Sequence, residues 1–200
     1  MLSRLTCHIL ILFTVLLGSS CASVNIPKFY NRNQPILDSI EQIYKQAYQK
    51  RHFSIEFTDR PFERVSLELV TDSLTYIYEF WVGEERMQDS LRKYGFDSSV
   101  INDLVTRMRS VNCTWINNLD YYAEEKKQSM IYISLWPRAI NSPFVNKKYY
   151  ILTYFSQPQY FDSNGNLMAG RRLRRIRRIN KEVFKRINER VCYTLSDRFR

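Results

Sequence analysis

Apolar and polar residues alternate in several segments of this chain, and this alternation constrains its fold more than any other feature of the sequence. Three alternating runs lie between residues 53 and 82, and a polar turn at residues 71–73 precedes the last of them. Residues 130–136 and 149–155 are two further segments rich in residues that favour strands. Because a period of two places apolar side chains on one face of a strand, the pattern predicts an antiparallel sheet of five to seven strands.

Helical spacing of apolar residues occurs in the intervening segments. A helix is predicted from Pro35 to about residue 50, since proline favours the first turn and apolar residues recur every three or four positions after it. Between Glu84 and Gly95 the acidic residues come first and the basic residues last, which is the charge order that a helix dipole favours. A further helix begins near Asp97, which can cap it. The sequence therefore predicts an α+β fold with helices on one face of the sheet.

The N-terminus has the three parts of a secretory signal. Arg4 is the only charged residue among the first 27, an apolar run follows from Ile9 to Leu17, and small residues follow that run. The run is too short for a membrane span, which needs about 20 apolar residues. We therefore predict that residues 1–20 are a signal peptide. The remaining chain has the length of one ordinary domain, which we place at residues 35–200.

The small residues that end the apolar run, Gly18-Ser19-Ser20-Cys21, resemble the lipobox of bacterial lipoproteins. In that family the cysteine is acylated and becomes the first residue of the mature protein. The resemblance implies a lipid-anchored protein of the bacterial cell envelope, at the outer or the inner membrane. Residues 21–34 have neither a helical nor a strand period, so we predict a tether between Cys21 and the domain. Ordinary secretion and an uncleaved N-terminal anchor remain open as alternatives.

The last 30 residues carry nearly all of the net charge. Residues 171–200 contain 12 Lys and Arg against 3 Asp and Glu, a net charge of +9, whereas the whole chain has +10. At about 100° per residue, the apolar residues between Leu173 and Val191 fall in one sector of a helix and nearly all the basic residues in the other. The pattern predicts a basic C-terminal amphipathic helix, and its cationic face contains Arg171, Arg174, Arg175, Arg177, Arg178, Lys181 and Lys185.

Three interpretations of this cationic face remain open. The helix could dock on the sheet and leave its basic face in solvent. The face could instead contact anionic lipid or a polyanion of the cell envelope, where each basic residue near the surface contributes about 1 kcal/mol. Nucleic acid is disfavoured because an exported protein rarely meets it.

Two cysteines, Cys113 and Cys192, remain in the mature domain once Cys7 leaves with the signal and Cys21 takes the lipid. In an oxidising compartment they are candidates for one disulfide. The alternative is that they are two separate, buried thiols.

Residues suited to catalysis or to metal binding are few. After the signal peptide, His52 is the only histidine, at a helix–strand junction where a surface position is expected, so no two-histidine metal site can form. The chain has no CxxC pair and no glycine-rich phosphate loop, and we expect no metal and no cofactor. We therefore expect a non-enzymatic binding or structural protein, whose protein partner the sequence does not identify. The alternative is a periplasmic or surface enzyme with a carboxylate-based site.

Overall fold

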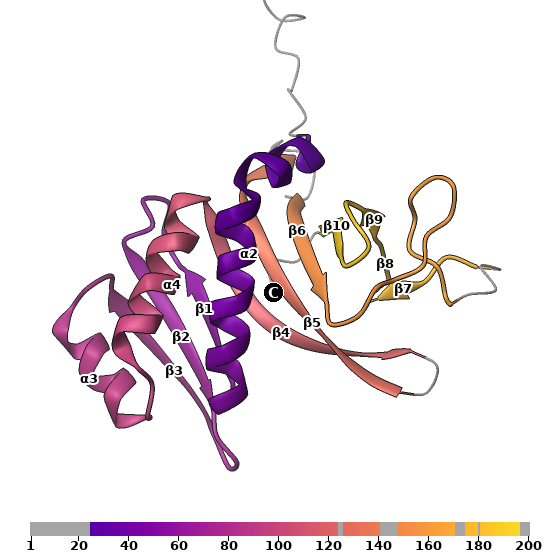
Figure 1. Cartoon of the computed structure of the whole chain (residues 1–200). Coiled ribbons are helices and arrows are strands. Elements are labelled where there is room, and N and C mark those ends of the chain that lie inside the picture. The colour runs from indigo at the N-terminus through magenta and orange to yellow at the C-terminus, as the bar shows by residue number, and fades with distance from the viewer. Residues whose placement is uncertain (1–24, 124–125, 141–147, 171–174, 180, 197–200) are drawn as a thin grey trace, which may run out of the picture.

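A computed structural model describes residues 25–123, 126–140, 148–170, 175–179 and 181–196 of the chain (Figure 1). The fold is α+β, as predicted, with three helices and an eight-stranded antiparallel sheet among the described residues. The helices are α2 (Ile26–Lys50), α3 (Glu85–Lys93) and α4 (Ser98–Ser110). The longer strands are β1 (Phe53–Phe57), β2 (Arg64–Val70), β3 (Thr75–Trp81), β4 (Cys113–Ala123), β5 (Lys126–Ile140), β6 (Lys148–Phe155) and β10 (Val191–Ser196). With the short β9 (Lys185–Arg186), they form a sheet in the order β3-β2-β1-β4-β5-β6-β10-β9.

Helix α2 begins nine residues before the start predicted at Pro35. The Asn25 side chain caps the helix by accepting a hydrogen bond from the Lys28 backbone N–H at 3.0 Å, and Pro27 lies in the first turn. Ile26 and Tyr30 are both 2% exposed, so this first part of the helix is packed on the domain. Residues 26–34 are therefore helical and do not form the predicted tether, while residues 21–24 lie outside the described part of the chain. Pro35 lies inside the helix on its exposed side.

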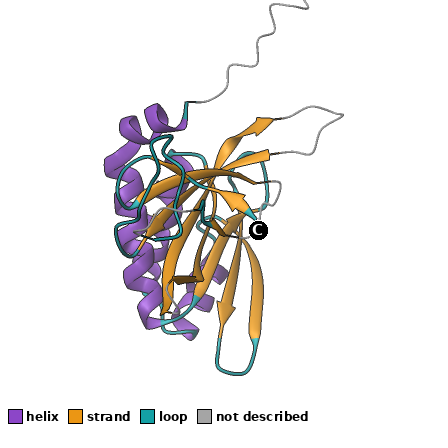
Figure 2. Ribbon diagram, turned by 90° about the vertical axis from the view of Figure 1, so that its right-hand side faces the viewer, coloured by secondary structure: helices purple, strands orange, loops and turns teal. Residues whose placement is uncertain are grey.

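The sheet buries apolar side chains on both of its faces. The three helices lie together on one face (Figures 1 and 2), where Leu37, Ile40 and Tyr44 of α2 are 0% exposed. The described residues of the segment 156–190 are here called the C-terminal lobe, whose apolar residues pack against β4, β5, β6 and β10 on the opposite face. Its last residues, 187–190, lie beside α2. Leu167 and Phe184 are the fully buried apolar residues of this lobe.

The prediction of a basic C-terminal helix is wrong. The described residues from 178 to 196 form the strands β7 (Arg178–Ile179), β8 (Glu182–Val183), β9 and β10. Strand β10 pairs with β6 through six residue pairs, from Val191↔Tyr154 to Ser196↔Tyr149. This pairing fills the backbone hydrogen bonds along the edge of β6, a long-range gain that helical spacing in the sequence does not reveal. The number of strands also exceeds the five to seven that the sequence predicted.

Candidate functional site

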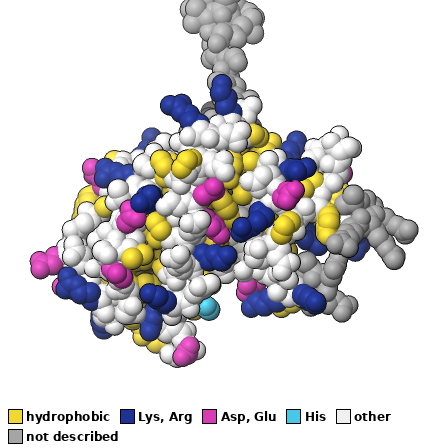
Figure 3. All heavy atoms as spheres, viewed as in Figure 1, with side chains coloured by type: hydrophobic (Ala, Val, Ile, Leu, Met, Phe, Trp, Pro, Cys, Tyr) yellow, Lys and Arg dark blue, Asp and Glu magenta, His cyan; other side chains and the backbone are white. Residues whose placement is uncertain are grey.

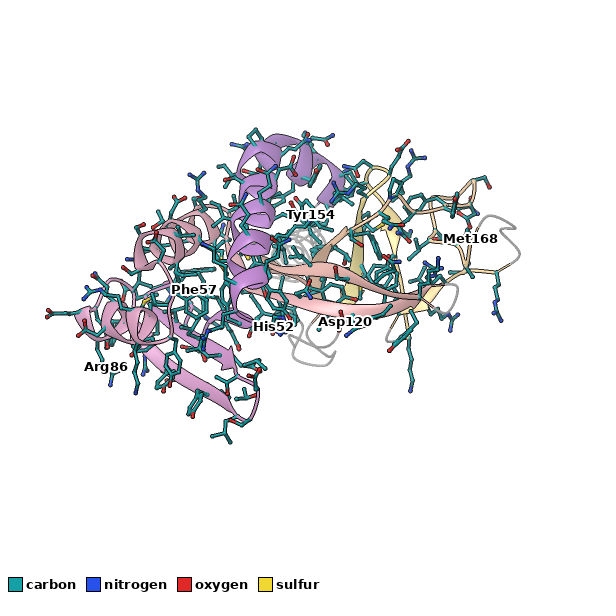
Figure 4. The ribbon with its side chains drawn as sticks, turned by 60° about the horizontal axis from the view of Figure 1, so that its bottom comes forward. His52, Phe57, Arg86, Asp120, Tyr154 and Met168 are labelled. Carbon is teal, nitrogen blue, oxygen red and sulfur yellow. The ribbon has the colours of Figure 1, made fainter. Side chains whose placement is uncertain are left out.

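A cleft of about 440 Å³ lies between α2 and the turn that precedes β10. Residues of α2 form one wall, and Tyr154 of β6 with Asn188, Glu189 and Arg190 of the turn form much of the other. Figure 4 shows Tyr154 beside α2. The volume lies within the usual range of small-molecule sites, about 300–1,000 Å³.

Five residues of α2 line the cleft because their spacing puts them on one side of the helix. They are Tyr30, Gln34, Asp38, Glu41 and Gln42, at intervals of four, four, three and one residues. A helix that starts at Pro35 would exclude the first two, so the sequence prediction missed this stripe. The signal that could have revealed it is the helix start itself, an asparagine cap at residue 25 followed by Pro27.

Asp38 is the centre of a hydrogen-bond network. Its Oδ1 accepts a hydrogen bond from the Tyr30 hydroxyl at 3.1 Å and another from the Tyr154 hydroxyl at 3.2 Å. Its Oδ2 accepts a hydrogen bond from Gln34 Nε2 at 3.2 Å. Asn188 Nδ2 donates to the Tyr30 hydroxyl oxygen at 3.4 Å. The network thus joins α2, β6 and the turn before β10, which lie far apart in the sequence.

The two phenols of this network are held in their neutral form. Burial and then the nearby Asp38 carboxylate raise the pKa of Tyr30 to about 12. Burial is also the main cause that raises the pKa of Tyr154 above its ordinary value, followed by the neighbouring Tyr30 and Asp38. Both hydroxyls therefore remain hydrogen-bond donors to Asp38 throughout the physiological pH range.

Glu41 is the most deeply placed acid of the cleft. The residue is 9% exposed, and its Oε1 lies 3.9 Å from Arg190 Nη2. This separation makes an ion pair but is longer than a hydrogen bond. Arg190 is held in place by the hydrogen bond that its Nε donates to the Phe155 carbonyl at 3.1 Å. The Glu41 carboxylate thus faces the cleft with charge compensation but without a hydrogen-bond donor among the described residues.

The cleft is acidic overall. Asp38, Glu41 and Glu189 contribute three negative charges and Arg190 one positive charge, so the lining has a formal charge of −2. Within the described ranges, no group of three or more His, Cys, Asp or Glu side chains is arranged to hold a metal ion. The phenols are poor nucleophiles while they stay protonated.

The basic residues predicted near the C-terminus lie on the C-terminal lobe. Arg175, Arg178, Lys181 and Lys185 are exposed, and none of them forms an ion pair with a described acidic residue. Arg177 is half-buried, where it donates to Gln159 Oε1 at 3.2 Å and lies over the Tyr121 ring. Arg171 and Arg174 lie outside the described residues. The described basic residues of this segment therefore lie on short strands and turns of the lobe, and they do not form one face of a helix.

A second hollow brings the lobe close to the start of α2. It has a volume of about 550 Å³ and is lined by Asn25, Ile26 and Pro27 together with Lys185 and residues of β10. Figure 3 shows Lys and Arg side chains over the start of α2, the end at which the described chain begins. Lys28 and Arg32 of the first turns of α2 are both exposed. Basic residues from opposite ends of the chain thus lie at one end of the molecule.

The predicted disulfide between Cys113 and Cys192 does not form in this structure, where both thiols are free and buried. Cys113 belongs to the core on the helical face of the sheet, and Cys192 belongs to the core under the lobe. Strands β5 and β6 lie between the two cysteine-bearing strands. Three strand spacings of about 4.8 Å separate the cysteines by roughly 14 Å, twice the Cα separation that a disulfide allows.

We expect both thiols to be unreactive in the folded protein. Burial raises the pKa of Cys192 to about 12 and raises that of Cys113 as well, so thiolate is scarce at pH 8. In a chain that begins at Ala22, these are the only cysteines. A thiol reagent such as DTNB should modify neither at pH 8 and should modify two per chain in denaturant. Rapid modification of either thiol without denaturant would contradict the burial described here.

The remaining sequence expectations concern His52 and the membrane. His52 is exposed, as predicted, and stacks on the Tyr48 ring with 4.5 Å between ring centroids. Cys21, the predicted lipidation site, lies outside the described residues. None of the described helices combines the length and the apolar character that crossing a membrane requires.

Compared with models of protein families, with curated proteins and with solved structures, the chain gives no significant match.

Proposed function

We propose that this protein is an exported, non-enzymatic lipoprotein, anchored through Cys21, whose basic end contacts anionic lipid of the cell envelope. The observation that carries the proposal is the hollow that Lys185 shares with the start of α2. It supports a geometry in which the anchor and unpaired basic residues lie at the same end of the domain.

Short distances make this contact strong enough to orient the domain. Asn25 is four positions after Cys21, a distance of at most about 14 Å along extended chain. An anchor at Cys21 would therefore hold Lys28, Arg32 and Lys185 within about one or two screening lengths of the headgroups at physiological salt. At about 1 kcal/mol for each basic residue, several such contacts fix an orientation without a specific pocket.

The cleft also bears on the alternative of a carboxylate-based enzyme. Asp38 and Glu41 converge there, as such an enzyme would require. However, Asp38 already accepts three hydrogen bonds, and Glu41 is paired with Arg190. Neither acid has a described nucleophile as its neighbour, so we propose that the cleft takes no part in a reaction.

Vesicle binding tests the basic surface. A chain that begins at Ala22 retains every described residue and lacks the anchor. We expect it to bind vesicles with anionic headgroups at low salt and to dissociate at several hundred millimolar salt. Changing Lys28, Arg32 and Lys185 to serine should weaken binding about 100-fold, because three contacts of about 1 kcal/mol each are lost. Cosedimentation with the vesicles measures both effects.

The matched control changes Arg92, Lys93 and Arg109 to serine, which removes the same charge from α3 and α4. If the two triple variants lose affinity equally, only net charge matters and the oriented contact is wrong. Failure of the unchanged chain to bind at low salt would also exclude it.

A further inference from the structure

The net charge of the cleft is opposite in sign to the net charge of the whole chain. Its lining has a formal charge of −2, whereas the chain has a net charge of +10. The carboxylates of a basic protein are stabilised electrostatically when basic side chains lie close to them. In this cleft Arg190 is the only basic residue among the described lining residues, and it pairs with Glu41 at 3.9 Å. The lining therefore keeps a net negative charge even though Arg190 pairs with Glu41.

The hydrogen-bonding capacity of the two α2 acids is also incompletely used. A carboxylate offers about four acceptor sites. Asp38 uses three of them for Tyr30, Tyr154 and Gln34, and the 3.9 Å contact of Glu41 with Arg190 uses none. Glu41 as a residue is 9% exposed, and its carboxylate opens into the cleft without a hydrogen-bond donor among the described residues. A ligand that donates hydrogen bonds would therefore find free acceptors there. The open acceptors of Asp38 and Glu41 lie one helical turn apart and line the same space.

We propose that this cleft binds a small organic cation through a primary ammonium or guanidinium group. Such a group carries three to five N–H donors, which match the open acceptors of Asp38 and Glu41. Tyr30 and Tyr154 hold the Asp38 carboxylate in place and act as positioning residues. The site involves other residues than the basic surface proposed to meet the membrane, so this inference goes beyond that function and can fail independently of it.

The same features favour an organic cation over a metal ion. Hard divalent cations take six or more oxygen ligands at about 2.0 to 2.6 Å. The acids of the cleft form no cluster of three that could hold a metal, among the described residues. A cleft of about 440 Å³ has room for a ligand of several heavy atoms, which exceeds the need of a bare ion.

In the first test, the full-length protein in detergent micelles is titrated with 1,4-diaminobutane and with agmatine. Calorimetry measures the heat of binding during each titration. The isosteric neutral compound 1,4-butanediol is the matched probe. We expect saturable binding of at least one cationic probe that weakens as salt is added, and no binding of the diol. The absence of saturable binding of both cationic probes at millimolar concentrations, or equal binding of the diol, would overturn the proposal.

Substitutions then locate the site. Glu41→Gln and Asp38→Asn should each weaken binding tenfold or more, because each removes a charge-assisted hydrogen bond. Asp38 also ties Tyr30 to Tyr154, so its substitution could unfold the protein. Gln34→Lys avoids this difficulty, since residue 34 is exposed and lies 3.2 Å from Asp38 Oδ2. The new ammonium group would occupy the site and abolish binding of the probe.

Gln49→Lys is the control, because it adds the same charge to an exposed position near the other end of α2. This variant should bind the probe nearly as well as the unchanged protein, and its thermal unfolding should match that of Gln34→Lys. If both lysine variants bind the probe equally, the cation binds elsewhere and the assignment to this cleft is wrong.

Discussion

Phe184→Ala is expected to destabilise the protein by about 3–5 kcal/mol, the usual cost of removing a fully buried phenylalanine ring. Phe184 is 0% exposed at the centre of the C-terminal lobe. Its ring lies against Phe155 at 6.2 Å and Tyr132 at 6.3 Å between centroids, so the substitution would leave a cavity between the lobe and the sheet. Urea denaturation of a chain that begins at Ala22 measures the change in free energy of unfolding.

Ile176→Ala is the control that distinguishes the lobe described here from the helix that the sequence predicted. A helix over residues 171–191 would bury Ile176 on the same face as Phe184, and both substitutions would then be costly. In the structure Ile176 is 42% exposed, so its substitution should change stability by less than about 1 kcal/mol. Equal losses of several kcal/mol for the two variants would contradict the fold described for the lobe.

The strands were predictable from sequence because their signal is local. Phe53, Ile55 and Phe57 alternate with polar residues and face the helices, as the period of two requires. The segments around residues 130–136 and 149–155 lie in β5 and β6. A single strand face can be recognised without knowledge of which strand pairs with which.

The C-terminus was mispredicted because its structure depends on a distant partner. Val191, Phe184 and Ile187 follow helical spacing, yet their backbone is extended or turned. Asn188 Oδ1 accepts hydrogen bonds from the backbone N–H groups of Arg190 and Val191, and this turn directs β10 onto β6. The favourable pairing with β6 is invisible in the local pattern, so tertiary contacts override it.

The candidate cleft was beyond sequence analysis for the same reason. Asp38 appears in the sequence as one polar residue among many on an amphipathic helix. Its importance arises from Tyr154 and Asn188, which belong to β6 and to the turn before β10. No local pattern indicates that residues so far apart share one network.

Cys21→Ser is expected to release the protein from the membrane fraction almost completely. Each buried methylene of an acyl chain contributes about 0.8 kcal/mol, so two chains of roughly 15 methylenes contribute more than 20 kcal/mol of membrane affinity. Serine at this position cannot carry the thioether-linked lipid. The basic surface remains in the variant and should retain it at membranes only at low salt. Fractionation of cells at low and at several hundred millimolar salt therefore separates the two contributions to membrane affinity.

Cys7→Ser makes the same chemical change inside the predicted signal peptide, and this variant should stay in the membrane fraction at both salt concentrations. Mass spectrometry of the mature N-terminus complements the fractionation, since acylation adds a lipid mass to a chain that starts at Cys21. If the unchanged protein retains Met1 and carries no lipid, the apolar run from Ile9 to Leu17 is an uncleaved anchor. If the unchanged protein starts at Ala22 or Ser23 without lipid, it is secreted by the ordinary route. Either result would exclude the lipoprotein.

The cationic-ligand cleft does not depend on this outcome, because its acids and their partners all lie between Tyr30 and Arg190.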